Sequence, residues 1–428
     1  MIPSFTHDTL RGLYARACRW RGAQDFFADP ALRLTGEQAW RASAGLANAF
    51  AARGMGNGTL VAFLCKPSAA HAAAWFAVPL GSGIACSLHV RETPQRLGET
   101  FAWLDAAIVV YDDDLAELAH AAVAAAPGAR ITALTLGEAL TAAASARGDA
   151  LAVPVQPDDL AAIILSSGST GRPKGVMHTH RTLVENAKAG QALYGTVSAG
   201  DATLVMMQPS FAAWVNVVLP YVGGHGKVVF DSTFSPARFL ATLERERITM
   251  APAVPTMWRM ILAEDTARYD LSAMKNVSIS GEPPARSDLE AIRALICAGI
   301  SVFYCSSESG TAGAVLATER ETLGKPGTPG KPATTGRPVV GGDIRIIDPD
   351  GSFDDELPPG SIGEIAVSGA SLAVGYWKDD ALTRASFRDG WWRSGDMGRI
   401  DADGDLVVEG RRDNVINTGG LKVHGEEI

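Results

Sequence analysis

Short apolar runs alternate with amphipathic segments along most of the chain. Each apolar run is too short for a helix and is bounded by polar or turn-forming residues, which predicts a buried β-strand. The strand predictions are Leu60–Cys65 and the runs AAIVVY, AAIILSS, TLVMMQ, KVVF, ITMAPAV, VSIS and SVFYCSS. Segments with apolar residues at helical spacing, such as SPARFLATLERER and ARSDLEAIRALICAG, separate several of them. This alternation predicts an α/β fold with mainly parallel sheets covered by helices.

Two helix predictions near the start of the chain rest on local sequence signals. Thr35 and Gln38 have the spacing of a capping box, in which a hydroxyl and an amide group satisfy backbone N–H groups at a helix start. An Ala/Leu-rich amphipathic run follows as far as Gly54. A second, more apolar helix is predicted from Ser68 to about Leu80.

The pattern changes after about Gly341. The runs DIRIID, EIAVSG, WWRSGDMGRID and DLVVEGR are divided by Asp-Gly and Pro-Gly turns, which predicts an antiparallel, β-barrel-like subdomain. A Pro/Gly-rich connector at Lys325–Pro338 precedes it. We therefore expect α/β subdomains at about 1–340 and the β-barrel-like subdomain at about 341–410, together forming a large N-terminal domain.

The longest uncharged run, Ala202–Gly226, raises the possibility of a membrane span. Proline removes backbone hydrogen bonds from a helix and amide side chains lack partners in hydrocarbon, so both argue against a lipid-exposed helix. These residues are Gln208, Pro209, Asn216 and Pro220. The run is therefore interpreted as buried protein interior, and no membrane span is expected.

Composition narrows the functional classes. The net charge of −9 over 428 residues argues against nucleic-acid binding, which requires a basic face. The N-terminus has no apolar signal core, and scattered cysteines without a C-x-x-C pair indicate free thiols, so a cytoplasmic protein is expected. The cysteines are Cys18, Cys65, Cys86, Cys297 and Cys305.

The segment ILSSGSTGRPKGVMHTH, residues 164–180, carries the strongest chemical signal. After the predicted strand, glycines allow backbone N–H groups to converge on an anion, and Lys174 adds a positive charge. Hydroxyl donors for phosphate oxygens are Ser166, Ser167, Ser169 and Thr170. The loop is not a Walker A motif, because Pro173 precedes the lysine and Gly175 follows it. A flexible solvent loop is the alternative, and the lysine favours a phosphate role.

This loop resembles the signature loop of the adenylate-forming superfamily, which includes the acyl-CoA synthetases and other AMP-dependent ligases. Four further segments resemble superfamily motifs, in the same order along the chain. They are SGEPP (Ser280–Pro284), YCSSES (Tyr304–Ser309), WWRSGDMG (Trp391–Gly398) and GRRDNVINTGG (Gly410–Gly420). The resemblance covers essentially the whole chain and implies the superfamily's fold, with ATP, Mg²⁺ and coenzyme A as expected cofactors.

The resemblance also implies roles for individual residues. Catalytic roles fall to Thr170, Lys174 and Glu308, and Glu308 is the expected Mg²⁺ ligand, since a buried carboxylate needs a compensating charge. The nucleotide-binding residues implied are Ser166, Ser167, Gly168, Ser169, Thr170, Gly171, Lys174, Gly281, Glu282, Pro283, Tyr304, Ser306, Ser307, Asp396 and Arg411.

Four of these residues also have a purely structural interpretation. Asp396 is expected to accept hydrogen bonds from the ribose hydroxyls, although an aspartate after Ser-Gly is commonly a turn residue. Glu308 has a structural salt bridge as its alternative. Tyr304 is expected to stack on adenine, although a strand tyrosine is most often core. Arg411 is expected to reach the ribose or phosphate, and by itself resembles a surface arginine.

Departures from the superfamily pattern inform the acyl site. The expected pocket residues are Phe211, Ala212, Trp214, Cys305 and Gly310. Cys305 replaces the motif glycine and should narrow the space beside the acyl group or the adenine. The segment Ala202–Gly226 lacks the aspartate that amino-acid-activating members use, and a buried ammonium without a counter-charge is disfavoured. An apolar carboxylic acid, aliphatic or aromatic, is therefore expected.

The remaining expectations concern the end of the chain and the reaction. Asp413 matches the superfamily hinge, so 411–428 is interpreted as the hinge and the start of a truncated C-terminal domain. The superfamily's C-terminal catalytic lysine has no counterpart, so little full activity is expected. His178 and His180 have no evident acidic partner and are assigned to helix packing or pocket lining.

The expected reaction forms an acyl adenylate from the acid and ATP and transfers the acyl group to coenzyme A. Two alternatives remain open at this point. One is transfer to the phosphopantetheine of an acyl carrier protein. The other is a catalytically impaired adenylate-binding module.

Overall fold

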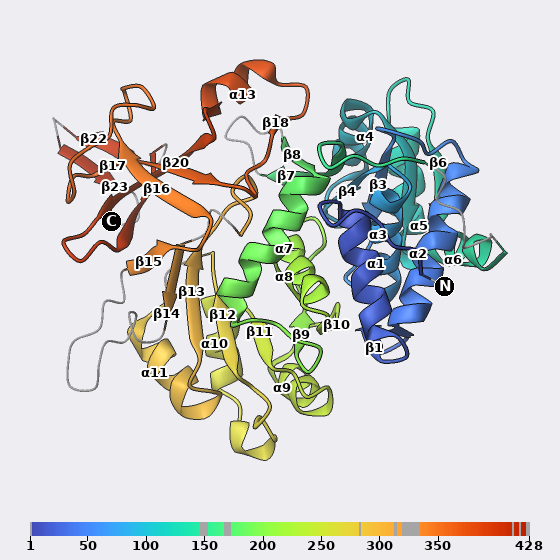
Figure 1. Cartoon of the computed structure of the whole chain (residues 1–428), viewed down its shortest axis with the longest axis horizontal. Coiled ribbons are helices and arrows are strands. Elements are labelled where there is room, and N and C mark those ends of the chain that lie inside the picture. Colours follow the sequence, from blue (N-terminus) through green and yellow to red (C-terminus); the bar gives the residue numbers. More distant parts are fainter. Residues whose placement is uncertain are drawn as a thin grey trace. The chain divides into compact units, whose positions relative to one another are not determined.

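A computed structural model describes residues 2–145, 153–166, 173–281, 284–311, 315–318, 334–412, 415–418 and 421–424. The chain forms two compact units (Figure 1). The first consists of residues 1–188, 197–234 and 373–378, and the second of residues 189–196, 235–372 and 379–428. Each unit contains β-sheets and helices, and the two are described separately.

A seven-stranded sheet with the order β18-β8-β7-β4-β3-β5-β6 is the main layer of the first unit. Its strands are β3 Leu60–Leu64, β4 Ile84–Ser87, β5 Ala106–Tyr111, β6 Thr132–Thr135, β7 Leu160–Ser166, β8 Lys174–Thr179 and β18 Gly375–Tyr376. The pairs among β3 to β7 are parallel, whereas β7–β8 and β8–β18 are antiparallel. The strands that flank the glycine-rich loop are therefore neighbours in one sheet.

Helices and a smaller set of strands complete the first unit. The helices are α1 Leu10–Arg21, α2 Gly36–Ala51, α3 Ala69–Leu80, α4 Pro94–Leu104, η1 Asp113–Leu115, α5 Ala116–Ala124, α6 Leu136–Ser145, α8 Ala212–Gly223 and the first part of α7 His180–Tyr194, whose residues from 189 onward belong to the second unit. The smaller set pairs in the order β9-β10-β1-β2, with β9 Ala202–Val205, β10 Lys227–Phe230, β1 Asp25–Ala28 and β2 Arg33–Thr35. Its first three strands are parallel, and β2 is antiparallel to β1.

Local sequence signals explain where these helices begin. The Thr35 hydroxyl accepts from Gln38 N while the Gln38 side chain accepts from Thr35 N, so the capping box is confirmed. The Ser68 hydroxyl accepts from His71 N at the start of α3. Such caps replace hydrogen bonds that the first helical turn lacks and contribute about 1 kcal/mol each.

The second unit begins with parallel strands and continues into an antiparallel sheet. Its strand order is β11-β12-β13-β14-β15-β21-β20-β17-β16, and β19 pairs with β20. The strands are β11 Met250–Pro252, β12 Asn276–Ile279, β13 Ile300–Tyr304, β14 Val315–Thr318, β15 Thr334–Pro338, β16 Gly342–Ile347, β17 Gly363–Gly369, β19 Phe387–Arg388, β20 Trp391–Ile400 and β21 Leu406–Arg411. Strands β11 to β13 are parallel, and all later pairs are antiparallel.

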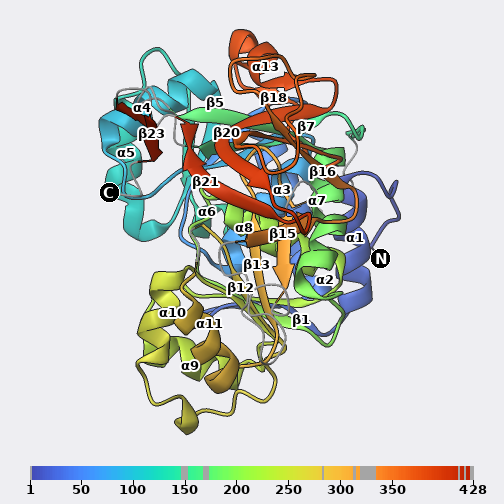
Figure 2. The same cartoon turned by 90° about the vertical axis from the view of Figure 1, so that its left-hand side faces the viewer.

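Helices α9 Pro236–Arg245, α10 Pro255–Leu262 and α11 Arg286–Leu295 pack together in this unit, with η2 Thr266–Arg268 and α13 Asp380–Ser386. The long strands β20 and β21 run side by side (Figure 2). A separate two-stranded sheet is formed by β22 Val415–Thr418 and β23 Leu421–His424. The curled antiparallel sheet and the helix-flanked parallel strands confirm the α/β fold with a β-barrel-like part.

Each unit has an apolar core of its own. In the first unit, side chains of β3 to β5 pack against α4 around the buried Phe101 and Val109. In the antiparallel sheet, Trp392 packs with Ile365 and Val367. Full burial of one such side chain stabilises the fold by about 1.5–3 kcal/mol.

The long uncharged run predicted to be interior is confirmed as such. It divides into β9 and the twelve-residue helix α8, and most of both are buried. Among the described residues, no helix combines the length and apolar character needed to cross a membrane. All cysteines are free, as the scattered spacing predicts.

Candidate active site

Asp396 lies at the centre of a polar cluster in the second unit. It is buried on β20, directly opposite Arg411 on β21. The Tyr304 hydroxyl, at the end of β13, donates to Asp396 Oδ2 at 2.6 Å, and Arg411 Nε lies 2.8 Å from Oδ1. The Arg411 side chain remains 61% exposed. A carboxylate oxygen accepts more than one hydrogen bond, so Asp396 retains capacity for ligand hydroxyls.

The turn before Asp396 fixes the direction of its carboxylate. Ser394 Oγ accepts from Asp396 N at 3.0 Å and donates to Ile365 O at 2.7 Å. Gly395 has a φ of 74°, which a residue with a side chain rarely adopts. Its N–H donates to Glu364 Oε1 at 3.1 Å. Backbone geometry therefore favours glycine at position 395, and the Ser394 hydroxyl holds the turn through its hydrogen bonds.

Tyr304 serves this cluster as a hydrogen-bond donor. Burial, followed by the nearby Asp396 carboxylate, raises the pKa of Tyr304 well above its ordinary value. The hydroxyl therefore stays protonated and donates to Asp396 at any working pH. This contact is distinct from the expected stacking of Tyr304 on adenine, which stays a prediction, and the Tyr304 side chain packs against the apolar core of the antiparallel sheet.

The loop after β13 places Glu308 on a rigid turn. Ser306 N donates to Ser309 Oγ at 3.0 Å, and Ser309 N donates to Ser306 Oγ at 2.9 Å. Ser371 Oγ donates to Ser309 O at 2.6 Å, which attaches the loop to a second segment. Gly310 has a φ of 57° and is buried, while Cys305 and Ser307 are half-buried and Glu308 is buried.

The chemistry of this loop fits the proposed metal role. No group of three or more His, Cys, Asp or Glu side chains suited to a metal ion occurs in the part of the chain that the structure describes. Magnesium in nucleotide sites needs only one or two carboxylates, because phosphates and water complete its shell. A single buried Glu308 is therefore compatible with Mg²⁺ that enters with a nucleotide.

The glycine-rich loop is anchored at both ends in the first unit. Ser166 ends β7 and Lys174 begins β8, and these two residues pair across the sheet. The Lys174 ammonium lies 5.4 Å from the centre of the Tyr376 ring on β18. Trp377 N donates to Gly175 O at 2.7 Å, and a Cβ on Gly175 would come within 2.9 Å of Trp377. Lys174 therefore lies at the end of the loop, with its ammonium beside the Tyr376 ring.

Several predicted site residues lie outside the described residues. They are Ser167, Gly168, Ser169, Thr170, Gly171, Glu282, Pro283 and Asp413. Gly281, which precedes two of them, has a φ of 95°. A residue with a side chain is therefore disfavoured at this position.

The predicted acyl-pocket residues fall into different environments. Phe211 is half exposed and its ring lies 5.5 Å from that of His89, while Ala212 begins α8 and is half-buried. Trp214 is fully buried, with ring centres 5.3 Å from His71 and 5.5 Å from Trp75. These three predicted residues belong to the first unit, and Cys305 and Gly310 belong to the second.

The two histidines after the loop are packed within the first unit. His178 Nδ1 lies 3.2 Å from Thr182 Oγ1, and His180 is the first residue of α7. Burial, with a smaller effect of Arg11, lowers the pKa of His180 to about 4. Asp159 opposes this shift, so the acidic neighbour that the sequence did not reveal is present. A buried, neutral His180 fits the helix-packing assignment.

For three residues at these sites, the sequence pattern did not indicate a role. Tyr376 contacts the loop lysine, Ser394 shapes the Asp396 turn, and Glu364 bonds the same turn from β17. The available signal for Glu364 was a lone acidic residue at the first position of the strand pattern EIAVSG. No local signal connects Tyr376 with Lys174, which is far away in sequence.

Comparisons with known proteins bear on the family. A family described as AMP-binding enzyme matches residues 15–377. A feruloyl-CoA synthase from an Amycolatopsis species is 32% identical over 402 residues, which are 92% of this chain and 77% of that protein. The fatty acid–[acyl-carrier-protein] ligase ScoC from Streptomyces coeruleorubidus is 27% identical over 401 residues, 92% of this chain and 75% of that protein.

A solved structure supports the same assignment at the level of the fold. The inhibitor-bound N-terminal domain of FACL13 from Mycobacterium tuberculosis matches with a TM-score of 0.86 at 21% identity. The match covers 94% of this chain and 99% of that chain. Family match, relatives and fold agree with the five sequence motifs. The chain therefore belongs to the AMP-binding enzyme family, as an acyl-CoA synthetase-like member of the adenylate-forming superfamily.

Proposed function

We propose that the protein joins an apolar carboxylic acid to coenzyme A in two steps. In the first, a substrate carboxylate oxygen forms a bond to the α-phosphorus of ATP, and the bond to pyrophosphate breaks. In the second, the thiol sulfur of coenzyme A attacks the acyl carbon, and AMP leaves with the bonding electron pair. The observation that carries the proposal is the buried Asp396 held between Tyr304 and Arg411, inside the ordered series of superfamily motifs.

Each described side chain has a defined task in the first step. Asp396 accepts hydrogen bonds from the ribose hydroxyls, which contribute about 1.5–3 kcal/mol each because the acceptor is charged. Lys174 neutralises phosphate charge beside the glycine-rich loop, and the hydroxyl of Thr170, which lies outside the described residues, is proposed as a further donor. Glu308 would hold Mg²⁺, which would neutralise charge at the phosphates when bound. Positioning and neutralisation of this kind supply most of the catalysis of phosphoryl-type transfer.

The acid substrate is proposed to be aromatic. The α8 region that contains Phe211, Ala212 and Trp214 carries no charged side chain between Ala202 and Gly226. The similarity to a feruloyl-CoA synthase supports an aryl acid over a straight-chain acid. Aromatic rings in such surroundings bury a large apolar area and gain further stabilisation from edge contacts.

Transfer to a carrier protein is a second candidate. It is supported by the similarity to ScoC, which is an acyl-carrier-protein ligase. In both candidates the first step is identical, so the acceptor alone distinguishes them. Asp413 is proposed as the hinge and Cys305 with Gly310 as pocket residues, under either candidate.

A panel of acids tests the proposal. The protein is incubated with ATP-Mg²⁺ and one acid at a time, and pyrophosphate release is measured with coenzyme A or with a phosphopantetheinylated carrier protein. We expect aryl acids and coenzyme A to give the highest kcat/KM. Preference for a straight-chain acid overturns the aromatic assignment, and preference for an α-amino acid overturns the apolar pocket. Thioester formation only on the carrier protein favours the second candidate.

A further inference from the structure

A short hydrogen bond ties the loop that carries Glu308 to a distant segment of the second unit. Ser371 Oγ donates to Ser309 O at 2.6 Å, although the two residues are 62 positions apart in the sequence. Both serines are fully buried. A hydroxyl-to-carbonyl hydrogen bond of this length is at the short end of the usual range, and away from water it is electrostatically stronger than in solvent. Ser371 therefore holds the backbone next to Glu308 in one position.

Hydrogen bonds within the loop extend this tie to both sides of Glu308. Ser306 N donates to Ser309 Oγ at 3.0 Å, and Ser309 N donates to Ser306 Oγ at 2.9 Å. Gly310 N donates to Ser306 O at 3.3 Å. Glu308 lies inside this closed turn and is only 7% exposed. Because the turn is closed, fixing Ser309 O from outside also fixes the backbone from which the Glu308 carboxylate projects.

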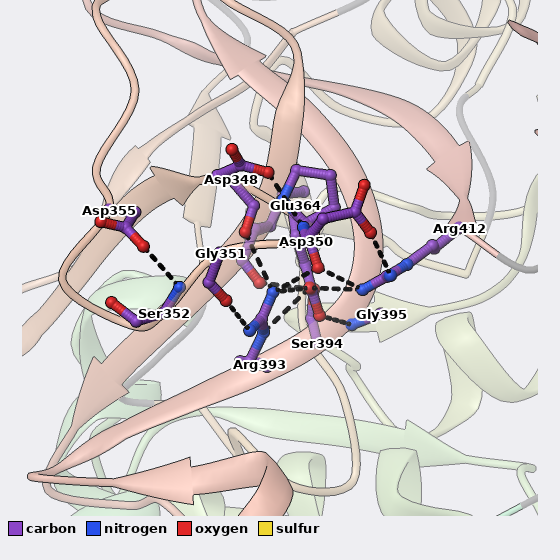
Figure 3. Close-up of polar contacts among 12 residues, drawn as sticks. Asp348, Asp350, Gly351, Ser352, Asp355, Glu364, Arg393, Ser394, Gly395 and Arg412 are labelled. Carbon is purple, nitrogen blue, oxygen red and sulfur yellow. Dashed lines mark hydrogen bonds and ion pairs between the residues drawn. The ribbon is translucent and has the colours of Figure 1, made fainter.

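The segment that carries Ser371 is itself well supported. Ser371 lies in the turn directly after β17, and the next residue, Leu372, packs against the apolar core of the antiparallel sheet. Near the start of β17, Glu364 accepts from Gly395 N and from two nitrogens of Arg393 (Figure 3). The strand before Ser371 is thus fixed by a buried ion pair, and the turn that contains Ser371 by an apolar contact.

We propose that Ser371 is a positioning residue for the Glu308 carboxylate and thereby sets the affinity of this site for Mg²⁺. The inference rests on the proposed function of Glu308. Mg²⁺ requires near-ideal octahedral geometry with metal–oxygen distances of about 2.0–2.1 Å, so a small displacement of a ligand weakens binding. Partners that orient a metal ligand by hydrogen bonds typically contribute about tenfold or more to metal affinity. In this role Ser371 acts through Ser309 and not by contact with the metal.

The test uses Ser371→Ala, with Glu308→Gln as the reference for a lost ligand and Ser301→Ala as the matched control. Ser301 is a buried serine on β13 whose Oγ accepts from Asn276 Nδ2 at 3.0 Å, so this control also loses a buried hydrogen bond. Mn²⁺, which prefers the same oxygen ligands as Mg²⁺, is titrated by electron paramagnetic resonance in the presence of a non-hydrolysable ATP analogue. The affinity for an acyl-adenylate analogue is measured by calorimetry without metal.

For Ser371→Ala we expect Mn²⁺ to bind about tenfold more weakly than to the wild type, because the Glu308 loop loses its tie to Ser371. The affinity for the acyl-adenylate analogue should not change, since this compound has no pyrophosphate for a metal to bridge. Pyrophosphate exchange should need more Mg²⁺ and return to near the wild-type rate when Mg²⁺ is saturating. Ser301→Ala should match the wild type in these measurements, although its midpoint of thermal unfolding should fall as in Ser371→Ala. A general loss of stability would not separate metal affinity from adenylate affinity.

The inference is overturned if a folded Ser371→Ala protein binds Mn²⁺ as tightly as Ser301→Ala, or if its metal and adenylate affinities fall together. If Ser371→Ala does not fold, Ser309→Ala decides by the same comparison, because it removes the hydroxyl that accepts from Ser306 N in the turn around Glu308. A Glu308→Gln protein that binds Mn²⁺ as tightly as the wild type contradicts the proposed function of Glu308 instead. The two failures are therefore distinguishable.

Discussion

In the first unit, the buried Trp214 lies among the rings of His71, Trp75 and Phe230, and its Nε1 has no hydrogen-bond partner among the described residues. His71 Nδ1 likewise lacks a partner there. In the second unit, the buried Glu364 accepts from four donors, and Asp396 from Tyr304 and Arg411.

The difference follows from the cost of burial. An unpaired neutral donor costs about 1–3 kcal/mol, which a large aromatic side chain offsets by its apolar contacts. A buried carboxylate without partners costs far more, so it persists only inside a network. The aromatic residues around Trp214 in the first unit are therefore held by packing, whereas the carboxylates of Glu364 and Asp396 in the second unit are held by fixed hydrogen bonds and ion pairs.

The largest expected effect is on the shape of the aromatic region. Trp214→Ala should lower the free energy of unfolding by about 3–5 kcal/mol, because it leaves a cavity among packed rings. Urea unfolding followed by circular dichroism measures this, with Trp20→Ala as the control. Trp20 is 70% exposed, so its loss should change stability by about 0.5 kcal/mol at most. Equal effects of the two substitutions would contradict a packed aromatic core.

The second effect tests the charged region. Asp396→Ala should weaken binding of an acyl-adenylate analogue by about 2–3 kcal/mol, a factor of tens or more, since it removes the charged acceptor proposed for the ribose hydroxyls. Calorimetry measures the affinity, and Asp389→Asn is the control. Asp389 is exposed and has a φ of 51°, which asparagine tolerates, so analogue affinity should not change. An unchanged affinity in Asp396→Ala would remove this residue from the ribose site.

Local signals in the sequence were sufficient to predict much of the fold. The sequence predicted the capping box at Thr35. It also predicted the bounds of β3, α3, β20 and β21 to within about one residue. These elements depend on periodicity, caps and turn residues, which neighbouring positions encode. The domain boundaries near residues 340 and 410 remain a prediction.

The contacts within the site could be predicted only in part. The motif order assigned Asp396 and Arg411 to one site, and their position opposite each other on β20 and β21 is consistent with it. The Tyr304–Asp396 hydrogen bond was not predicted, because it joins strands that are distant in sequence. Glu364 was read as an ordinary strand residue, since strand periodicity does not reveal which partner a buried charge has.

The third prediction uses pH to contrast the two regions. Burial lowers the pKa of His71 from 6.5 to about 3, so between these values the unfolded chain binds a proton that the folded chain does not. Stability contributed by neutral His71 is therefore present above about pH 6.5 and is lost as the pH falls toward 3. Between about pH 7 and pH 5 this loss amounts to about 2 kcal/mol.

The variant His71→Phe should lack this loss while keeping the edge contacts with Phe63 and Trp214. Urea unfolding at the two pH values gives the comparison, and His180 is present in both proteins, so its titration cancels. We expect the wild-type stability to fall by about 2 kcal/mol more than that of the variant. Parallel pH profiles would show that His71 is not held neutral in the folded state.

The smallest expected effect concerns Tyr376, an aromatic residue of the first unit that contacts a charged side chain. Its ring faces the Lys174 ammonium, and a cation–π contact contributes about 0.5–2 kcal/mol. Tyr376→Leu should therefore raise the KM for ATP by a few-fold with a smaller change in kcat, because the Lys174 ammonium loses its contact with the aromatic ring. Tyr376→Phe keeps the ring and should behave as wild type in pyrophosphate exchange. A KM that rises equally in both variants would assign the effect to the hydroxyl, and the aromatic region would then contribute shape alone.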